Sequence, residues 1–158
     1  MKKIVLSLLL VISVMLFSGC SSKPVDFTGK KTFTCTNESI SSESRTTSYV
    51  TFSYDNKENL DEFELKSIST FNNDYSANLM YNLFSPISSA AKQSGLYFDT
   101  KKENNTISIT TSGSFSKFAS IIVKLNNLTG NEVGEIPNAT KSDAFASFTE
   151  SGYVCRDN

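Results

Sequence analysis

The sequence has 158 residues, with 15 basic and 16 acidic side chains, three cysteines, and neither histidine nor tryptophan. The missing histidine removes the commonest general base and the commonest metal ligand. The slightly acidic balance disfavours nucleic-acid binding, which needs a basic surface. The length suits one domain with a hydrophobic core and is short for two ordinary domains.

The first 19 residues have the pattern of a secretory signal peptide. Lys2 and Lys3 precede an uncharged, mostly apolar run from Ile4 to Gly19, as the basic start and apolar centre of such a signal require. The run is slightly short for a membrane span, which needs about 20 apolar residues. We therefore predict a signal at residues 1–19. Its removal takes Lys2 and Lys3 from the 15 basic residues and leaves 13 against 16 acidic ones.

The signal ends in Phe17-Ser18-Gly19-Cys20, which resembles the lipobox of bacterial lipoproteins, although Phe17 stands where leucine is usual. The resemblance implies that a diacylglyceryl group is added to the Cys20 thiol and that cleavage makes Cys20 the new N-terminus. Two acyl chains anchor a protein stably, whereas one holds it only marginally. Residues 20–30 are then expected to form the lipid anchor and a short polar tether. Residues 31–158 are expected to form a single extracytoplasmic domain on the cell membrane, or on the outer membrane of a Gram-negative host.

The other two cysteines, Cys35 and Cys155, are left as a pair. In an exported protein such a pair favours a disulfide. The bond would close a loop of roughly 120 residues, for which the chain-entropy model gives at most about 4 to 5 kcal/mol. The alternative is a redox-active or nucleophilic thiol, but neither cysteine has a Cys-x-x-Cys spacing or a neighbouring histidine.

Alternating side chains predict three strands joined as an antiparallel meander. A polar turn at Asp55–Asn59 separates the second strand from the third. The alternation slips before Ile68, where we predict a β-bulge or the end of pairing. The three strands are expected at Lys31–Glu38, Thr46–Tyr54 and Leu60–Phe71.

Residues 72–94 change to a helical period. Asp74 is expected to cap the start of this helix, and Pro86 to kink or break it after Ser85. Gly95 is expected to end the helical stretch. Apolar side chains at every fourth position, with Phe84 and Ala90 alongside them, are predicted to face the core: Tyr75, Leu79, Leu83, Ile87 and Ala91.

A hairpin is predicted from Leu96–Thr100 and Thr106–Thr111, with a polar turn at Lys101–Asn105 between them. In the second strand of this hairpin the alternation places Ile107 and Ile109 on the inner face.

Three further segments complete the chain. Phe115–Leu125 is compatible with a helix or a strand, and Asn126–Pro137 is expected to be a loop. A last helix at Thr140–Ser151 would place Phe145 and Phe148 inward. Together the elements predict an α+β fold, with a mostly antiparallel sheet made of the three-strand meander plus the hairpin, and with helices packed on one face.

Four short segments join the lipobox in a pattern that covers nearly the whole chain. They are FTCT (Phe33–Thr36), LFSPI (Leu83–Ile87), NNTISITTSGSF (Asn104–Phe115) and ESGYVC (Glu150–Cys155). In this order they resemble the YehR-like lipoproteins, small exported proteins of low-GC Gram-positive bacteria. The resemblance implies an exported α+β domain clamped by Cys35 and Cys155, and it implies no enzymatic activity.

Motifs for catalysis or metal binding are weak. Ser-x-x-Lys occurs at Ser89–Lys92 and at Ser114–Lys117, but the Ser-Asp-Asn and Lys-Thr-Gly elements that accompany it in serine β-lactamases are missing. The acidic residues around the Asp55–Asn59 turn lack the spacing of a calcium loop. We therefore predict no catalytic residue, no metal site and no cofactor.

These observations predict a lipid-anchored, non-enzymatic binding module of the cell envelope, whose partner is an envelope protein or a small ligand and not a nucleic acid. A structural or surface-coating lipoprotein is the alternative, and an envelope serine hydrolase a second one. Tyr49, Tyr81 and Tyr97 are candidates for a binding surface because tyrosine is enriched there, although ordinary sheet positions explain them as well. An exposed apolar patch away from the tether would favour binding over coating.

Overall fold

The computed structural model describes residues 23–87, 95–120 and 139–158. The expected signal peptide at residues 1–19, Cys20, and the expected loop at residues 126–137 lie outside these ranges.

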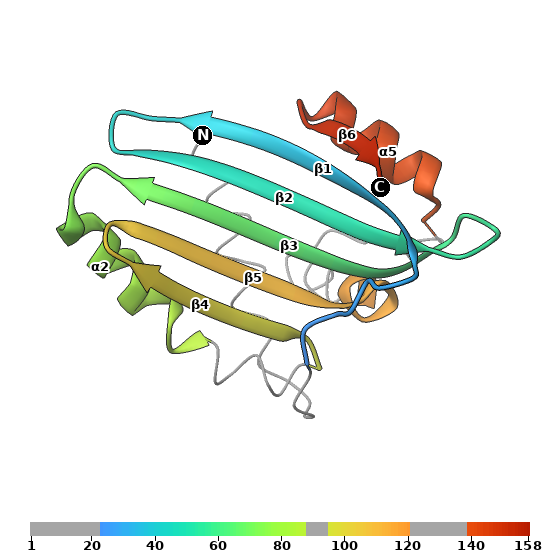
Figure 1. The fold of residues 1–158 in the computed structure, drawn as a ribbon, viewed down its shortest axis with the longest axis horizontal. Helices are drawn as coiled ribbons and strands as arrows, with labels where there is room; N and C mark the ends of the chain where they lie inside the picture. The colour runs from blue at the N-terminus through green and yellow to red at the C-terminus, as the bar shows by residue number, and fades with distance from the viewer. Residues whose placement is uncertain (1–22, 88–94, 121–138) are drawn as a thin grey trace, which may run out of the picture.

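The described chain forms an antiparallel sheet of six strands in the order β4-β5-β3-β2-β1-β6, with helices beside it (Figure 1). This architecture confirms the α+β prediction. The strands are β1 (Lys31–Ile40), β2 (Ser44–Tyr54), β3 (Leu60–Phe71), β4 (Tyr97–Glu103), β5 (Thr106–Ser114) and β6 (Val154–Asp157). The labelled helices are α2 (Asp74–Phe84) and α5 (Lys141–Glu150), and residues 115–120 are also helical.

The meander of β1, β2 and β3 is confirmed, and its register brings three phenylalanines into one row. Phe33 lies opposite Phe52, and Phe52 lies opposite Phe63. The rings of Phe33 and Phe52 stack with their centroids 5.3 Å apart. Since directly opposed residues share a face of the sheet, this row defines an inner, apolar face.

The bulge lies at a different place from the predicted one. Phe52 pairs with Phe63 but Tyr54 pairs with Leu60, so two residues of β3 lie opposite Ser53. The Ser53 hydroxyl accepts a hydrogen bond from the Glu62 amide at 3.1 Å, which satisfies a donor at the irregular position.

The predicted bulge before Ile68 is wrong, because Ile68 stays in register with Thr47 on one side and Ser108 on the other. The change in the sequence pattern has another cause. Beyond Leu65 the inner positions of β3 carry Ser67 and Ser69, so the composition of the face changes while the pairing continues.

The helices cover the inner face, as predicted. Phe145 of α5 contacts Phe33 with ring centroids 5.9 Å apart. Phe118, in the helical residues 115–120, lies 4.7 Å from the ring of Phe63. The helix α2 adds a second, smaller cluster that contains Phe84, Phe98 and half-buried Ile109. The segment that was compatible with helix or strand is therefore helical over residues 115–120, and residues 121–125 lie outside the described ranges.

The start of α2 differs from the prediction, while its end agrees. Asn73 caps the helix, because its side chain accepts the Ser76 amide at 2.8 Å. Asp74, the expected cap, lies in the first turn and forms an ion pair with Lys102 at 2.7 Å. The helix ends at Phe84 with Ser85 as its C-terminal cap, as predicted from Pro86.

The prediction of which residues meet the core is right for Phe84 and Ile87, which pack in the second cluster, and wrong for the row along α2 itself. Tyr75, Leu79 and Leu83 are 78, 52 and 54% exposed, whereas Ala77 and Phe84 are buried. The helix carries two apolar rows, and the four-residue spacing of the larger side chains made the wrong row look stronger. The small Ala77 side chain lets the backbone of α2 lie close to its neighbours, and Phe84 then reaches the buried Phe98.

The C-terminal helix follows its sequence closely. Thr140 and Asp143 form a reciprocal capping box at the start of α5, which satisfies two backbone donors. Phe145 and Phe148 pack against the main core, as predicted. Gly152 has a positive φ of 85°, and this turn directs the chain into β6.

The two faces of α2 lead to a stability prediction. Replacing buried Phe84 with alanine should lower the free energy of unfolding by about 3 to 5 kcal/mol, because it leaves a cavity under the helix. The matched change Leu83→Ala, on the neighbouring exposed residue, should cost less than about 0.5 kcal/mol. Urea unfolding of both variants without reductant measures the difference, and equal losses would contradict the assignment of the buried face.

Candidate functional site

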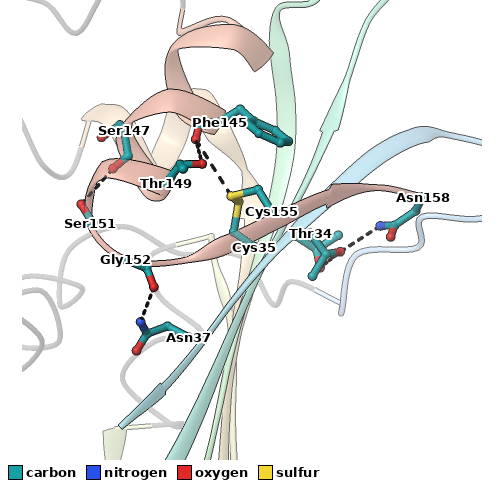
Figure 2. Close-up of a disulfide and its surroundings, with 11 residues drawn as sticks. Thr34, Cys35, Asn37, Phe145, Ser147, Thr149, Ser151, Gly152, Cys155 and Asn158 are labelled. Atoms are coloured by element: carbon teal, nitrogen blue, oxygen red, sulfur yellow. Dashed lines mark hydrogen bonds between the residues drawn. A yellow bond between two sulfur atoms is a disulfide. The ribbon is translucent and has the colours of Figure 1, made fainter.

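The predicted disulfide between Cys35 and Cys155 is confirmed. The two residues lie directly opposite each other on β1 and β6 and are 120 positions apart in the chain. Cys35 is fully buried within the main core cluster. The Cys155 sulfur lies 4.0 Å from the carbonyl oxygen of Phe145 (Figure 2). The bond is therefore an integral part of the core and has a structural role.

Hydrogen bonds on both sides of the disulfide attach the C-terminal segment to β1. The Asn37 side chain donates to the Gly152 carbonyl at 2.8 Å, and the Asn158 side chain donates to the Thr34 hydroxyl at 2.8 Å (Figure 2). These contacts lie before and after Cys155, so α5 and β6 are held to β1 along the whole length of β6.

A hollow of about 390 Å³ lies where α5 begins. Its lining includes Glu58, Lys141 and Asp157. The Lys141 ammonium lies 2.6 Å from the Asp157 carboxylate and 4.8 Å from the centroid of the Tyr54 ring. The hydrogen bond to Asp157 raises the pKa of Lys141. The ammonium therefore stays charged at neutral pH and is already paired with the Asp157 carboxylate. The hollow therefore provides no unpaired positive charge from Lys141 for an anionic ligand.

The acidic turn after β2 is organised by hydrogen bonds. The Asp55 carboxylate accepts the backbone amides of Lys57 at 2.8 Å and Asn59 at 2.9 Å, and also the Asn59 side-chain amide at 3.0 Å. The bonds from Asn59 lower the pKa of Asp55. Both carboxylate oxygens thus serve to close the turn. Within residues 23–87, 95–120 and 139–158, no group of three or more residues of metal-ligating type comes together.

The Ser-x-x-Lys motif at Ser114–Lys117 falls where β5 passes into the helical residues 115–120. The Ser114 hydroxyl is 2.7 Å from the hydroxyl of Ser116. The Lys117 amine lies so close to Gly95 that a Cβ at Gly95 would be 2.9 Å from it. The other motif, Ser89–Lys92, lies outside the described residues.

The three tyrosines that the sequence suggested for a binding surface are less exposed than a fourth one. Tyr49, Tyr81 and Tyr97 are all half-buried, and burial raises the pKa of Tyr97. The strongly exposed tyrosine is Tyr75, which the sequence pattern assigned to the core. The exposure of Tyr75 could have been inferred from the second apolar row of α2. A helix that is apolar on two sides cannot bury both sides against one sheet.

Tyr75, Leu79 and Leu83 form a ridge on the exposed side of α2, which we name the α2 apolar row. Their spacing of four residues places them one turn apart on the same side of the helix, over about 12 Å. The single charged residue in the sequence of α2 is Asp74, which is paired with Lys102. The α2 apolar row is therefore an uncharged surface made of three large side chains.

The segment before β1 lies on the opposite face of the sheet from the helices. The Val25 amide donates to the Ser112 hydroxyl at 3.2 Å, and the Lys30 amine forms an ion pair with Glu62. Val25 and Phe27 are half-buried. In Figure 1 this blue segment runs from the start of β1 past the start of β3 and the end of β5, towards the start of β4.

Comparisons with known proteins inform the fold alone. No family model and no curated protein matches the sequence. A solved structure, the NMR structure of a protein from Streptococcus pneumoniae TIGR4, is similar with a TM-score of 0.50 and 14% sequence identity. The match covers 85% of this chain and 89% of that one. It supports the α+β architecture, and the resemblance to YehR-like lipoproteins stays a prediction.

None of the helices formed by the described residues combines the length and the apolarity needed to cross a bilayer.

The buried disulfide leads to a second stability prediction. The double variant Cys35→Ala/Cys155→Ala should lose about 2 to 5 kcal/mol of unfolding free energy, because its unfolded chain is no longer cross-linked. Urea unfolding without reductant measures the loss. Reductant should destabilise the unmodified protein to a similar extent and leave the double variant unchanged. Unfolding curves that coincide for the two proteins without reductant would contradict a structural role.

Proposed function

We propose that the protein is a lipid-anchored, non-enzymatic binding module of the cell envelope. In this proposal Cys20 carries the lipid, and the α2 apolar row docks onto another envelope protein. Support for export and anchoring comes from the lipobox-like Phe17–Cys20 sequence and from the buried disulfide, which suits an oxidising compartment.

The exposure of the α2 apolar row is the observation that carries the binding proposal. Single exposed apolar residues are ordinary on protein surfaces, but a contiguous group of large ones is typical of interaction sites. A row of side chains at i, i+4 and i+8 is one of the ridges by which helices pack into grooves. A protein groove or helix is therefore the occupant whose shape suits the row.

The start of α2 lies far from the point where the chain leaves for the anchor. Lys31 pairs with Tyr54 at one end of the meander, and Ile40 pairs with Arg45 at the other. The segment before β1 belongs to the first end, whereas α2 starts next to the second, where the Asn72 side chain donates to the Ser42 carbonyl. This position favours binding over a coating role, because the exposed row begins at the end remote from the tether.

Photo-cross-linking in living host cells tests the docking surface. A photoreactive residue at position 79 should capture a defined partner, while the same residue at Val154, 61% exposed on β6, should not. Adding Leu83→Asp to the position-79 protein should abolish the capture without changing stability, since the Leu83 side chain is 54% exposed. The docking proposal fails if both positions capture the same abundant neighbours.

Mass spectrometry of the N-terminal peptide tests the anchor. The mature protein should begin at Cys20 and carry a diacylglyceryl group, and Cys20→Ala should release the protein from the membrane fraction. The control is the Cys35→Ala/Cys155→Ala pair, which should stay with the membrane. An unmodified Cys20 in membrane-extracted protein would overturn the anchor.

A further inference from the structure

Residues 23–30, which we name the strap, were expected to be a polar tether but lie against the polar face of the sheet. Ser112 lies opposite Glu64, one position from the inner residues Phe63 and Leu65, so its side chain is on the polar face. Ser112 is nevertheless fully buried, and its hydroxyl accepts the Val25 amide at 3.2 Å. The strap therefore covers part of a face that the helices leave open.

The strap also has internal order. The Asp26 carboxylate accepts the Thr28 amide at 2.9 Å, and the Lys30 amide donates to the Phe27 carbonyl at 3.1 Å. The hydrogen bonds from Thr28 lower the pKa of Asp26. Gly29 has a positive φ of 73°, a conformation that favours glycine. These contacts form a turn that leads the strap into β1, and a flexible linker would have none of them.

A second attachment joins the strap to the middle of the sheet. The Lys30 amine is paired with Glu62 of β3, and both side chains are about a third exposed or less. The attachments at Glu62 and Ser112 lie on adjacent strands, because β3 pairs with β5. The strap thus crosses the sheet from β1 to β5, and it leaves the sheet near the start of β4 (Figure 1).

We infer that the strap is a docking device that sets the distance and the orientation of the domain relative to the lipid surface. The inference rests on the proposed lipid at Cys20. Three residue steps separate Cys20 from Lys23, and they span at most about 11 Å. The sheet end that holds the strap and the Asp55–Asn59 turn therefore faces the lipid headgroups at close range. The β1–β2 turn points away, at a distance of about 36 Å along the 11 residues of β2.

Undocking the strap would change this geometry. Its eight residues would add up to about 26 Å of reach and would free the domain to turn. The strap contacts thus decide between a domain held upright near the membrane and one that moves on a longer tether.

Energy transfer to a headgroup dye tests the inference on full-length, lipidated protein in phosphatidylcholine vesicles. Donors are attached at Lys57→Cys in the β2–β3 turn or at Ser42→Cys in the β1–β2 turn. Transfer should be strong from position 57 and weak from position 42. Lys30→Glu combined with Ser112→Ala should release the strap and let position 57 move up to about 26 Å farther from the headgroups. Energy transfer from position 57 should then fall, and the difference in transfer between positions 57 and 42 should shrink.

Two controls separate undocking from other effects. Adding Glu62→Lys to the Lys30→Glu change, with Ser112 intact, reverses the ion pair and should restore the contrast between the sites. Eight residues inserted between Ser22 and Lys23 lengthen the tether without touching the strap, and they should lower transfer from position 57. Folding of each variant is checked by its unfolding transition.

The possible failures are distinguishable. Equal transfer from positions 57 and 42 in the lipidated protein, or no response to the strap variant, overturns the inference and leaves the anchor in place. A protein without lipid on Cys20, seen by mass spectrometry, overturns the anchor and the inference together.

Discussion

The row of Phe33, Phe52 and Phe63 is the contact on which the rest of the fold depends. These residues lie directly opposite one another on β1, β2 and β3, and they fix which face of the sheet is the inner one. A slip of the strand register by one residue would move these side chains to the opposite, solvent-facing side of the sheet. The position of Cys35 follows from the row, because it lies two residues from Phe33 and shares the inner face. The disulfide, and with it β6 and α5, is therefore placed by the same alternation.

Much of this arrangement could be predicted because its signals are local. The alternation in β1 to β3 has a period of two over many residues, and a strand with one buried face requires that period. The last helix was predicted at Thr140–Ser151 with Phe145 and Phe148 inward, and it lies at Lys141–Glu150, within one residue at each end. The Cys35–Cys155 pair followed from counting the thiols of a chain that the sequence predicts to be exported. In each case the sequence carries the constraint directly.

The remaining features depend on contacts between distant segments. The buried face of α2 is decided by the fit of Ala77 and Phe84 against β4 and β5, and periodicity within the helix does not contain that fit. The strap is attached through the backbone amide of Val25, which has no sequence signature. Half-buried Val25 and Phe27, which alternate with polar residues, were the available hint that residues 23–30 lie on a surface. The bulge at Ser53 likewise depends on the partner strand.

The strand β1 joins the two ends of the domain. The strap leads directly into Lys31, while Cys35 binds β6 covalently and the Asn158 side chain donates to Thr34. In the anchored protein that we propose, a pull from the membrane would reach the domain at the start of β1, which pairs with β2 along its whole length and is bonded to β6 by the disulfide. The disulfide also ties β1 to the C-terminal segment, whose helix α5 packs Phe145 and Phe148 on the core. In that proposal, undocking of the strap changes how the domain stands on the membrane, while β1 and the segment that holds α5 and β6 stay joined by the disulfide.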